Sequence, residues 1–244
     1  MLIDGQHEIA VASASGIRLQ RLFVPAEQLA AAETVVRSWA GSELLEIQPL
    51  LGRAMERVAY GQRGKGWVAV AEQPRVRLDG IDLGPEPLVL VLDRIEKPGN
   101  IGACARTAVA CGVGAVLVTD PICDVFNPNA VRASRGAIFA VPIVPTTVAE
   151  AASFLAQRGI VPHCARVEAP LGLWECDLRQ PVAICIGNET RGLGDRWRDA
   201  RAIDYCIPMR PPVDSLNASI TAAVSLYECA RQRQVGRSGG LGVR

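Results

Sequence analysis

Residues 88–119 read LVLVLDRIEKPGNIGACARTAVACGVGAVLVT. The stretch opens with an apolar run at 88–92 and closes with a second one at 115–119. Pro98 and Gly99 interrupt the chain after the first run, and we expect residues 99–111 to form a helix. A strand, a helix and a second strand in this order predict a βαβ unit, whose two strands run parallel.

The same alternation continues toward the C-terminus. Further helices are expected over residues 129–139, 149–158 and 215–233, and further strands over 161–165, 183–186 and 204–207. Strands that are apolar throughout and separated by helices are typical of a mostly parallel sheet covered on both faces. The fold class that follows is α/β.

The pattern of the N-terminal part of the sequence predicts a second, smaller α/β unit. Short β-like runs at 22–24 and 67–70 accompany helix-like runs at 25–39 and 48–60. Residues 72–87 are rich in Pro, Gly, Asp and Arg, which is typical of a connection between domains. We therefore expect domains over 1–78 and 79–235, with the boundary near Asp79, and a flexible glycine-rich tail over 236–244.

Composition excludes several classes of protein. No apolar run approaches the roughly 20 residues of a membrane span, and residues 1–8 lack a secretory signal, so we expect a cytoplasmic protein. The eight cysteines are scattered without a C-x-x-C pair, which argues against a metal site. The formal net charge of +1 does not by itself suggest nucleic acid, although basic residues cluster locally at Arg53, Arg57, Arg63 and Lys65.

Polar residues and glycines follow three of the expected strands, where open α/β sheets build their sites. The first such segment, residues 92–108, contains Asn100 and Arg106. Alone, this segment is compatible with Asn100 as a helix cap and Arg106 as a surface ion-pair partner.

The second segment, AICIGNETRGLG at 183–194, contains three glycines but no dinucleotide or triphosphate fingerprint. The third, IPMRPPVDSLNASITAAVSLYE at 207–228, leads from a strand through a Pro-rich loop into a helix. Alone, a glycine-rich turn is often only a turn, and Ser215 could be an ordinary N-cap.

Taken together, the three segments resemble the three motifs of the SpoU (TrmH) family of RNA methyltransferases, in order and spacing. The matching residues are Asn100 to Thr107, the Ile-Gly-Asn-Glu at 186–189, and Ile207-Pro208-Met209 followed by Ser215-Leu216-Asn217-Ala218-Ser219. The resemblance covers residues 88–233. An N-terminal α/β domain makes the chain similar to the thiostrepton-resistance and ribosomal-RNA branch of the family.

This resemblance implies a deep C-terminal trefoil knot over 183–233, within a SPOUT fold. It implies S-adenosylmethionine as the cofactor, held largely by backbone groups. The implied cofactor contacts are Gly187, Asn188, Ile207, Met209 and Leu216.

The resemblance also implies methyl transfer to a ribose 2′-hydroxyl. Arg106 is the implied principal catalytic residue, holding the phosphate or stabilising the developing alkoxide. Asn100, Glu189, Ser215 and Asn217 would surround it, with Glu189 beside Arg106 as an orienting pair. A homodimer through the knot and the final helix is implied, and the N-terminal domain would bind RNA through Arg53, Arg57, Arg63 and Lys65.

Three alternatives remain open on the sequence. A nucleotide-binding oxidoreductase is opposed by the missing dinucleotide fingerprint. A non-catalytic RNA-binding module, or a base methyltransferase with the same fold, would share the motifs. Ribosomal RNA is the first choice of substrate and transfer RNA the second, and no role is assigned to residues 168–176.

Overall fold

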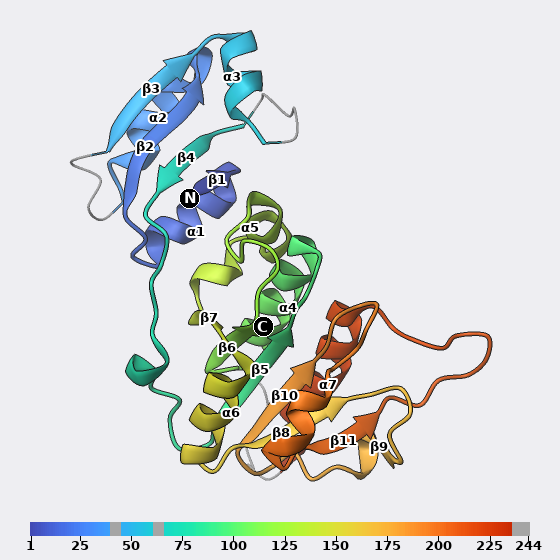
Figure 1. Cartoon of the computed structure of the whole chain (residues 1–244). Coiled ribbons are helices and arrows are strands. Elements are labelled where there is room, and N and C mark those ends of the chain that lie inside the picture. Colours follow the sequence, from blue (N-terminus) through green and yellow to red (C-terminus); the bar gives the residue numbers. More distant parts are fainter. Residues whose placement is uncertain (40–44, 61–65, 236–244) are drawn as a thin grey trace.

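The computed structural model describes residues 1–39, 45–60 and 66–235, which form two sheets joined by one connecting segment (Figure 1). Two of the predicted RNA contacts, Arg63 and Lys65, and the predicted tail over 236–244 lie outside the described residues.

The larger sheet has seven strands in the order β7-β6-β5-β10-β8-β11-β9, and every neighbouring pair is parallel. Its strands β5, β6 and β10 are buried at every residue, because apolar runs are stable as strands when both faces are covered. The seven strands are β5 (Leu88–Asp93), β6 (Ala115–Thr119), β7 (Ile143–Thr146), β8 (Val161–Ala165), β9 (Leu171–Gly172), β10 (Val182–Ile186) and β11 (Ile203–Cys206).

Helices cover both faces of this sheet. Leu88, Leu90 and Leu92 of β5 pack in one apolar cluster with α4 (Pro98–Ala110), α5 (Pro128–Ser134) and α7 (Ala218–Val235). Val89 and Val91, which point the other way, pack in a second cluster with α6 (Val148–Gln157). Burying each of these side chains contributes about 1.5–3 kcal/mol. The prediction of an α/β fold with a mostly parallel sheet is confirmed.

The smaller sheet has the order β1-β4-β2-β3. Its elements are β1 (Leu2–Asp4), α1 (Gln6–Ala14), β2 (Leu19–Pro25), α2 (Leu29–Val36), β3 (Glu46–Leu50), α3 (Gly52–Val58) and β4 (Val68–Ala71). The helix expected over 48–60 is wrong in its first part, because β3 pairs in parallel with β2 through Leu50. Pro49 is tolerated there because β3 is an edge strand. The elements β1 and α1 were not predicted.

The smaller sheet packs against α5 of the larger part. Buried Asp4 forms an ion pair with Arg132, with 2.9 Å between Oδ2 and Nη2, and Asn129 donates to the hydroxyl of Tyr60 at 3.1 Å. The helix expected over 129–139 ends at Ser134, because the next two residues are left-handed. The second of them is Gly136, where a Cβ atom would lie 2.8 Å from that of Val11. The division into domains at residue 78 stays a prediction.

The connecting segment, residues 72–87, contains the short 3₁₀ turn η3 (Leu78–Gly80) and no longer helix or strand. The final helix α7 begins at Ala218, three residues later than expected. Among the described helices, none combines the length and the apolar character that crossing a bilayer requires.

Candidate active site

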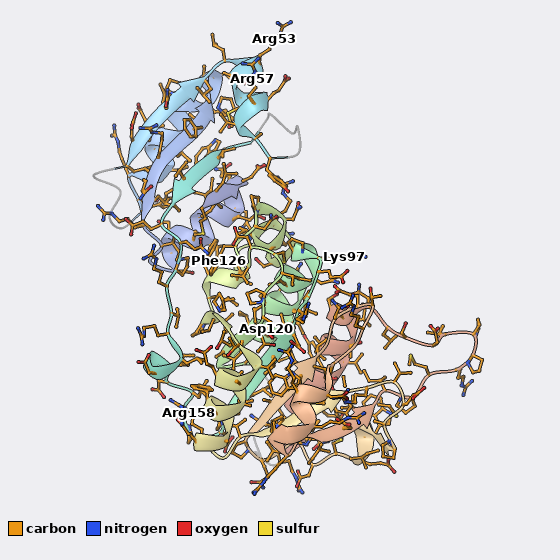
Figure 2. The ribbon with its side chains drawn as sticks, in the orientation of Figure 1. Arg53, Arg57, Lys97, Asp120, Phe126 and Arg158 are labelled. Carbon is orange, nitrogen blue, oxygen red and sulfur yellow. The ribbon has the colours of Figure 1, made fainter. Side chains whose placement is uncertain are left out.

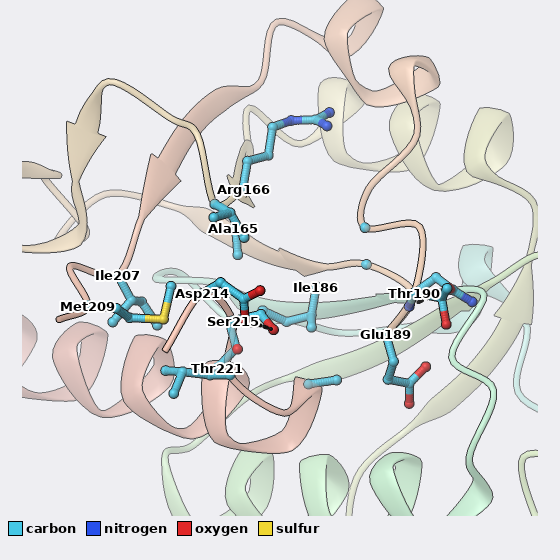
Figure 3. A pocket seen from close by; sticks show the side chains of 16 residues that line it. Ala165, Arg166, Ile186, Glu189, Thr190, Ile207, Met209, Asp214, Ser215 and Thr221 are labelled. Atoms are coloured by element: carbon cyan, nitrogen blue, oxygen red, sulfur yellow. Dashed lines mark hydrogen bonds between the residues drawn. The ribbon is translucent and has the colours of Figure 1, made fainter. Parts of the chain in front are cut away.

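Three neighbouring strands, β8, β10 and β11, end at one cavity of about 390 Å³ (Figure 3). The carboxyl ends of parallel strands meet at one edge of a sheet, so the loops that follow them line a common space. The predicted cofactor contacts Gly187, Asn188, Ile207, Met209 and Leu216 all line this cavity, as do Glu189 and Ser215. The structure thus brings the second and third sequence motifs together.

Asn188 organises the loop that follows β10. Its buried side chain accepts hydrogen bonds from the backbone N–H groups of Thr190 and Arg191, both at 2.9 Å. It donates through Nδ2 to the carbonyl of Arg94 at 2.9 Å and to the carboxylate of Glu96 at 3.0 Å. One amide side chain therefore ties the loop after β10 to the loop after β5.

Gly187 lies where the backbone of this loop turns back on itself. A Cβ atom at this position would lie 2.3 Å from the carbonyl carbon of Gly192 and 2.3 Å from the nitrogen of Leu193. Asn188 and Gly192 pair as an isolated β-bridge that closes the turn. Glycine is required here for close approach of two backbone segments, which leaves backbone groups at the cavity wall.

Arg166, directly after β8, forms hydrogen bonds to the C-terminal end of the loop that follows β10. Its Nε atom donates to Asp204 at 2.9 Å, while its two terminal nitrogens donate to the carbonyls of Leu193 and Gly194 at 2.6 and 3.1 Å. The guanidinium is half-buried, and in Figure 3 it points away from the other labelled side chains. Arg166 therefore shapes the cavity wall with its charge already paired.

Glu189 joins all three motifs beside the cavity. It accepts a hydrogen bond from Nδ2 of Asn100 at 2.5 Å and one from the backbone N–H of Glu96 at 3.1 Å. The oxygen of Asn100 in turn accepts from Nδ2 of Asn217 at 3.3 Å. Partial burial raises the pKa of Glu189, but the hydrogen bonds outweigh it, so this pKa lies below its ordinary value. The carboxylate is ionised at neutral pH and fixes the orientation of the Asn100 amide.

Neither Asn100 nor Ser215 is the helix cap that its segment alone would have allowed. Asn100 lies inside the first turn of α4, which begins at Pro98, so its side chain is free to reach Glu189. Ser215 lies before α7, and its hydroxyl contacts Asp214 at 3.4 Å. Asn217 caps this helix instead, because its side-chain oxygen accepts from the backbone N–H of Ser219 at 2.9 Å.

Arg106 is exposed on α4, two turns beyond Asn100. Within the described residues it forms no ion pair, so the expected pairing of Arg106 with Glu189 is not found. Glu189 bonds to Asn100 instead. An arginine that no carboxylate neutralises is available for a phosphate or another anion.

Part of the cavity wall was not predicted from the sequence: Ala165, Arg166, Val167, Thr190, Asp214 and Thr221. Ala165 ends the expected strand at 161–165, and Arg166 and Val167 follow it, so the strand-end argument used for the other motifs could have included all three. Asp214 lies within the third segment, directly before Ser215. It could have been suspected as a charged residue in that loop, but nothing local says that it faces a cavity.

The predicted RNA contacts Arg53 and Arg57 lie on α3, at the end of the N-terminal part far from the larger sheet (Figure 2). Both side chains are exposed, and neither forms an ion pair with a described residue. The structure does not bring them to the cavity.

The described residues contain no group of His, Cys, Asp and Glu side chains arranged to hold a metal ion. The cysteines are all free, and burial raises the pKa of Cys104 to about 12, as expected for a thiol in apolar surroundings.

Comparison with known proteins is consistent with this geometry. A sequence model described as the SpoU rRNA Methylase family matches residues 87–227. The 23S rRNA (guanosine-2′-O-)-methyltransferase RlmB of Ralstonia nicotianae is 35% identical over 194 residues, which cover 77% of this chain and 77% of that protein. The 23S rRNA (uridine(2479)-2′-O)-methyltransferase of Streptomyces viridochromogenes is 37% identical over 177 residues, covering 70% of this chain and 62% of that protein.

The crystal structure of the SpoU methyltransferase AviRb from Streptomyces viridochromogenes, in complex with the cofactor AdoMet, superposes with a TM-score of 0.88. It is 29% identical in sequence, and the match covers 97% of this chain and 91% of that one. The fold and the cavity define an α/β protein with its site at the carboxyl ends of parallel strands. The chain belongs to the SpoU rRNA methylase family.

Proposed function

We propose that this chain transfers the methyl group of S-adenosylmethionine to the 2′-hydroxyl of a ribose in RNA, with ribosomal RNA as the first choice of substrate and transfer RNA as the second. The observation that carries the proposal is the Asn217–Asn100–Glu189 hydrogen-bond chain beside the cavity, which joins the three family motifs. Two relatives with this activity, similar over at least 70% of this chain, support it.

The cavity fits the cofactor that AviRb binds. Its volume of about 390 Å³ lies in the range of small-molecule sites, and the turn at Gly187 offers backbone groups that a larger residue would block. In the proposed site, Gly187, Asn188, Ile207, Met209 and Leu216 hold S-adenosylmethionine. When bound, this cofactor supplies a methyl group activated by a sulfonium.

The chain's own residues then position the RNA. Ionised Glu189 holds the amide of Asn100, and Asn100 and Asn217 together with Ser215 orient the target nucleotide. Arg106, which is exposed and unpaired among the described residues, holds a phosphate or stabilises the alkoxide that develops as the hydroxyl loses its proton. Orienting the hydroxyl in line with the methyl group supplies much of the rate enhancement.

We place a trefoil knot in residues 183–233 and a homodimer interface on the knot and α7. Support for the interface comes from large apolar side chains that α7 leaves exposed, Ile220 at 51% and Tyr227 at 58%, with Val109 of the adjoining α4 at 37%. We also place an RNA-binding function in residues 1–78, supported by the exposed Arg53 and Arg57, which form no ion pair in the described part of the chain. Free cysteines suit the cytoplasm.

The test is methylation of ribosomal RNA by the purified protein with isotopically labelled S-adenosylmethionine, followed by mass spectrometry of the nucleosides. We expect a 2′-O-methylnucleoside, and a loss of about 10²–10³-fold in rate for Arg106→Ala. Arg75→Ala, an exposed arginine of the connecting segment, is the matched control and should keep full activity.

A methylated base in place of a ribose would overturn the ribose assignment. Retention of RNA without any methyl transfer would favour a binding module instead of an enzyme. Full activity of Arg106→Ala would remove Arg106 from the reaction while leaving the family assignment intact.

A further inference from the structure

The cavity contains one carboxylate that has no good hydrogen-bond partner or ion pair among the described residues. Two carboxylates line the cavity, those of Glu189 and Asp214. Each oxygen of Glu189 accepts one of the hydrogen bonds described above. Asp214 receives, among the described residues, a single contact from the hydroxyl of Ser215 at 3.4 Å, which is longer than an ordinary O–H···O hydrogen bond.

No cation of the described cavity wall neutralises Asp214. The cationic side chain that lines the cavity is Arg166, and its guanidinium is already paired with Asp204 and bonded to two carbonyls. In Figure 3 the carboxylate of Asp214 lies amid the lining side chains, whereas the guanidinium of Arg166 points away from them. The cavity therefore carries uncompensated negative charge, which favours a cationic group on its ligand.

S-adenosylmethionine has two such groups, the sulfonium and the α-ammonium of its methionine part. An ammonium offers three N–H donors, whereas a sulfonium offers none. A carboxylate with unused lone pairs gains most from a partner that brings both charge and donors, because charge-assisted hydrogen bonds are the strong ones. The ammonium is thus the better match for Asp214.

We propose that Asp214 binds the α-ammonium group of S-adenosylmethionine and is the contact that selects the amino-acid end of the cofactor. The inference rests on the cofactor site proposed above. The position of Asp214 in the chain suits this role, since it lies in the loop after β11 between Met209 and Leu216, both predicted to contact the same ligand.

Calorimetric titration with three ligands tests the proposal. S-adenosylmethionine carries both cationic groups, S-adenosylhomocysteine keeps the ammonium without the sulfonium, and 5′-methylthioadenosine lacks both. For Asp214→Asn we expect affinity to fall about ten-fold for the first two ligands and to stay unchanged for the third. Asp79→Asn, which removes an exposed carboxylate of the connecting segment, is the matched control and should bind all three like the parent.

The outcomes separate this proposal from the one on which it rests. Unchanged binding of S-adenosylmethionine by a folded Asp214→Asn protein would overturn it. An equal loss for 5′-methylthioadenosine would assign Asp214 to the nucleoside, and a loss confined to S-adenosylmethionine would assign it to the sulfonium; either result refutes the ammonium contact. If the parent itself binds none of the ligands, the proposed cofactor site is wrong.

Because Asp214 is exposed and has one weak contact, Asp214→Asn should unfold at the temperature of the parent. Asp214→Glu keeps the charge, and we expect it to retain more affinity for S-adenosylmethionine than Asp214→Asn does. If Asp214→Glu and Asp214→Asn lose the same affinity, shape and not charge decides binding at this position.

Discussion

Replacing Gly187 by alanine should disturb the loop after β10, which lines the cavity, while the rest of the protein stays folded. The new Cβ atom would lie 2.3 Å from two backbone atoms of residues 192 and 193, about 1 Å short of the 3.4 Å at which ordinary contacts begin. Backbone atoms cannot rotate aside as a side chain can, so the turn closed by the Asn188–Gly192 bridge must open. Overpacking of this kind costs about 1–3 kcal/mol of stability, and each kcal/mol lowers the melting temperature by about 2–4 °C in a chain of this size.

The substitution should also weaken cofactor binding, because the opened turn forms part of the cavity wall. We expect Gly187→Ala to remain folded and to bind S-adenosylmethionine at least about ten-fold more weakly, a change of about 1.4 kcal/mol. Thermal unfolding and calorimetric titration measure the two effects on the same samples.

Gly194→Ala is the matched control for this substitution. It lies in the same loop, its Cβ atom would meet nothing within 4 Å, and its φ of −67° suits any residue. It should bind the cofactor like the parent. The reasoning is refuted if Gly187→Ala binds as tightly as Gly194→Ala, since the close approach of the two backbone segments would then have no part in forming the site.

Two further substitutions, at Glu189 and Arg166, test the hydrogen bonds that hold the loops around the cavity in place. The pKa of Glu189 is lower in the folded state than its ordinary value of 4.5, so its stabilising effect is complete above about pH 4.5 and is lost as the pH falls through the folded-state pKa. Glu189→Gln should remove that part of the pH dependence, as measured by thermal unfolding between about pH 3 and 6, and parallel curves for the two proteins would contradict the assignment. Arg166→Lys keeps the charge near Asp204 but loses the planar fork that reaches two carbonyls, so urea unfolding should show a loss of about 1–3 kcal/mol. Arg198→Lys, an exposed pair with Asp195, should change stability by less than about 0.5 kcal/mol, and similar losses at both arginines would argue against the role of Arg166.

Much of the larger sheet could be predicted from local pattern. An apolar run such as Val89-Leu90-Val91 is compatible with a strand buried on both faces, and the glycines and helices between such runs leave few alternatives. The wrong elements are those whose local pattern competes with a distant contact. Residues 48–50 pair with β2, and the helix expected to continue past Ser134 ends where Gly136 meets Val11.

By itself, the sequence determined the α/β class and the placement of three motifs at strand ends, because each depends on residues close together in the chain. The tertiary structure alone decided that Glu189 bonds to Asn100 and not to Arg106, that Asn217 caps the last helix, and that Asp214 and Arg166 line the same cavity as the second and third motifs. These relations join residues from different strands and loops, so they depend on the register and packing of the folded sheet. A local sequence pattern indicates whether a segment forms a helix or a strand. Which residue a given side chain contacts depends on how those elements pack in the folded protein.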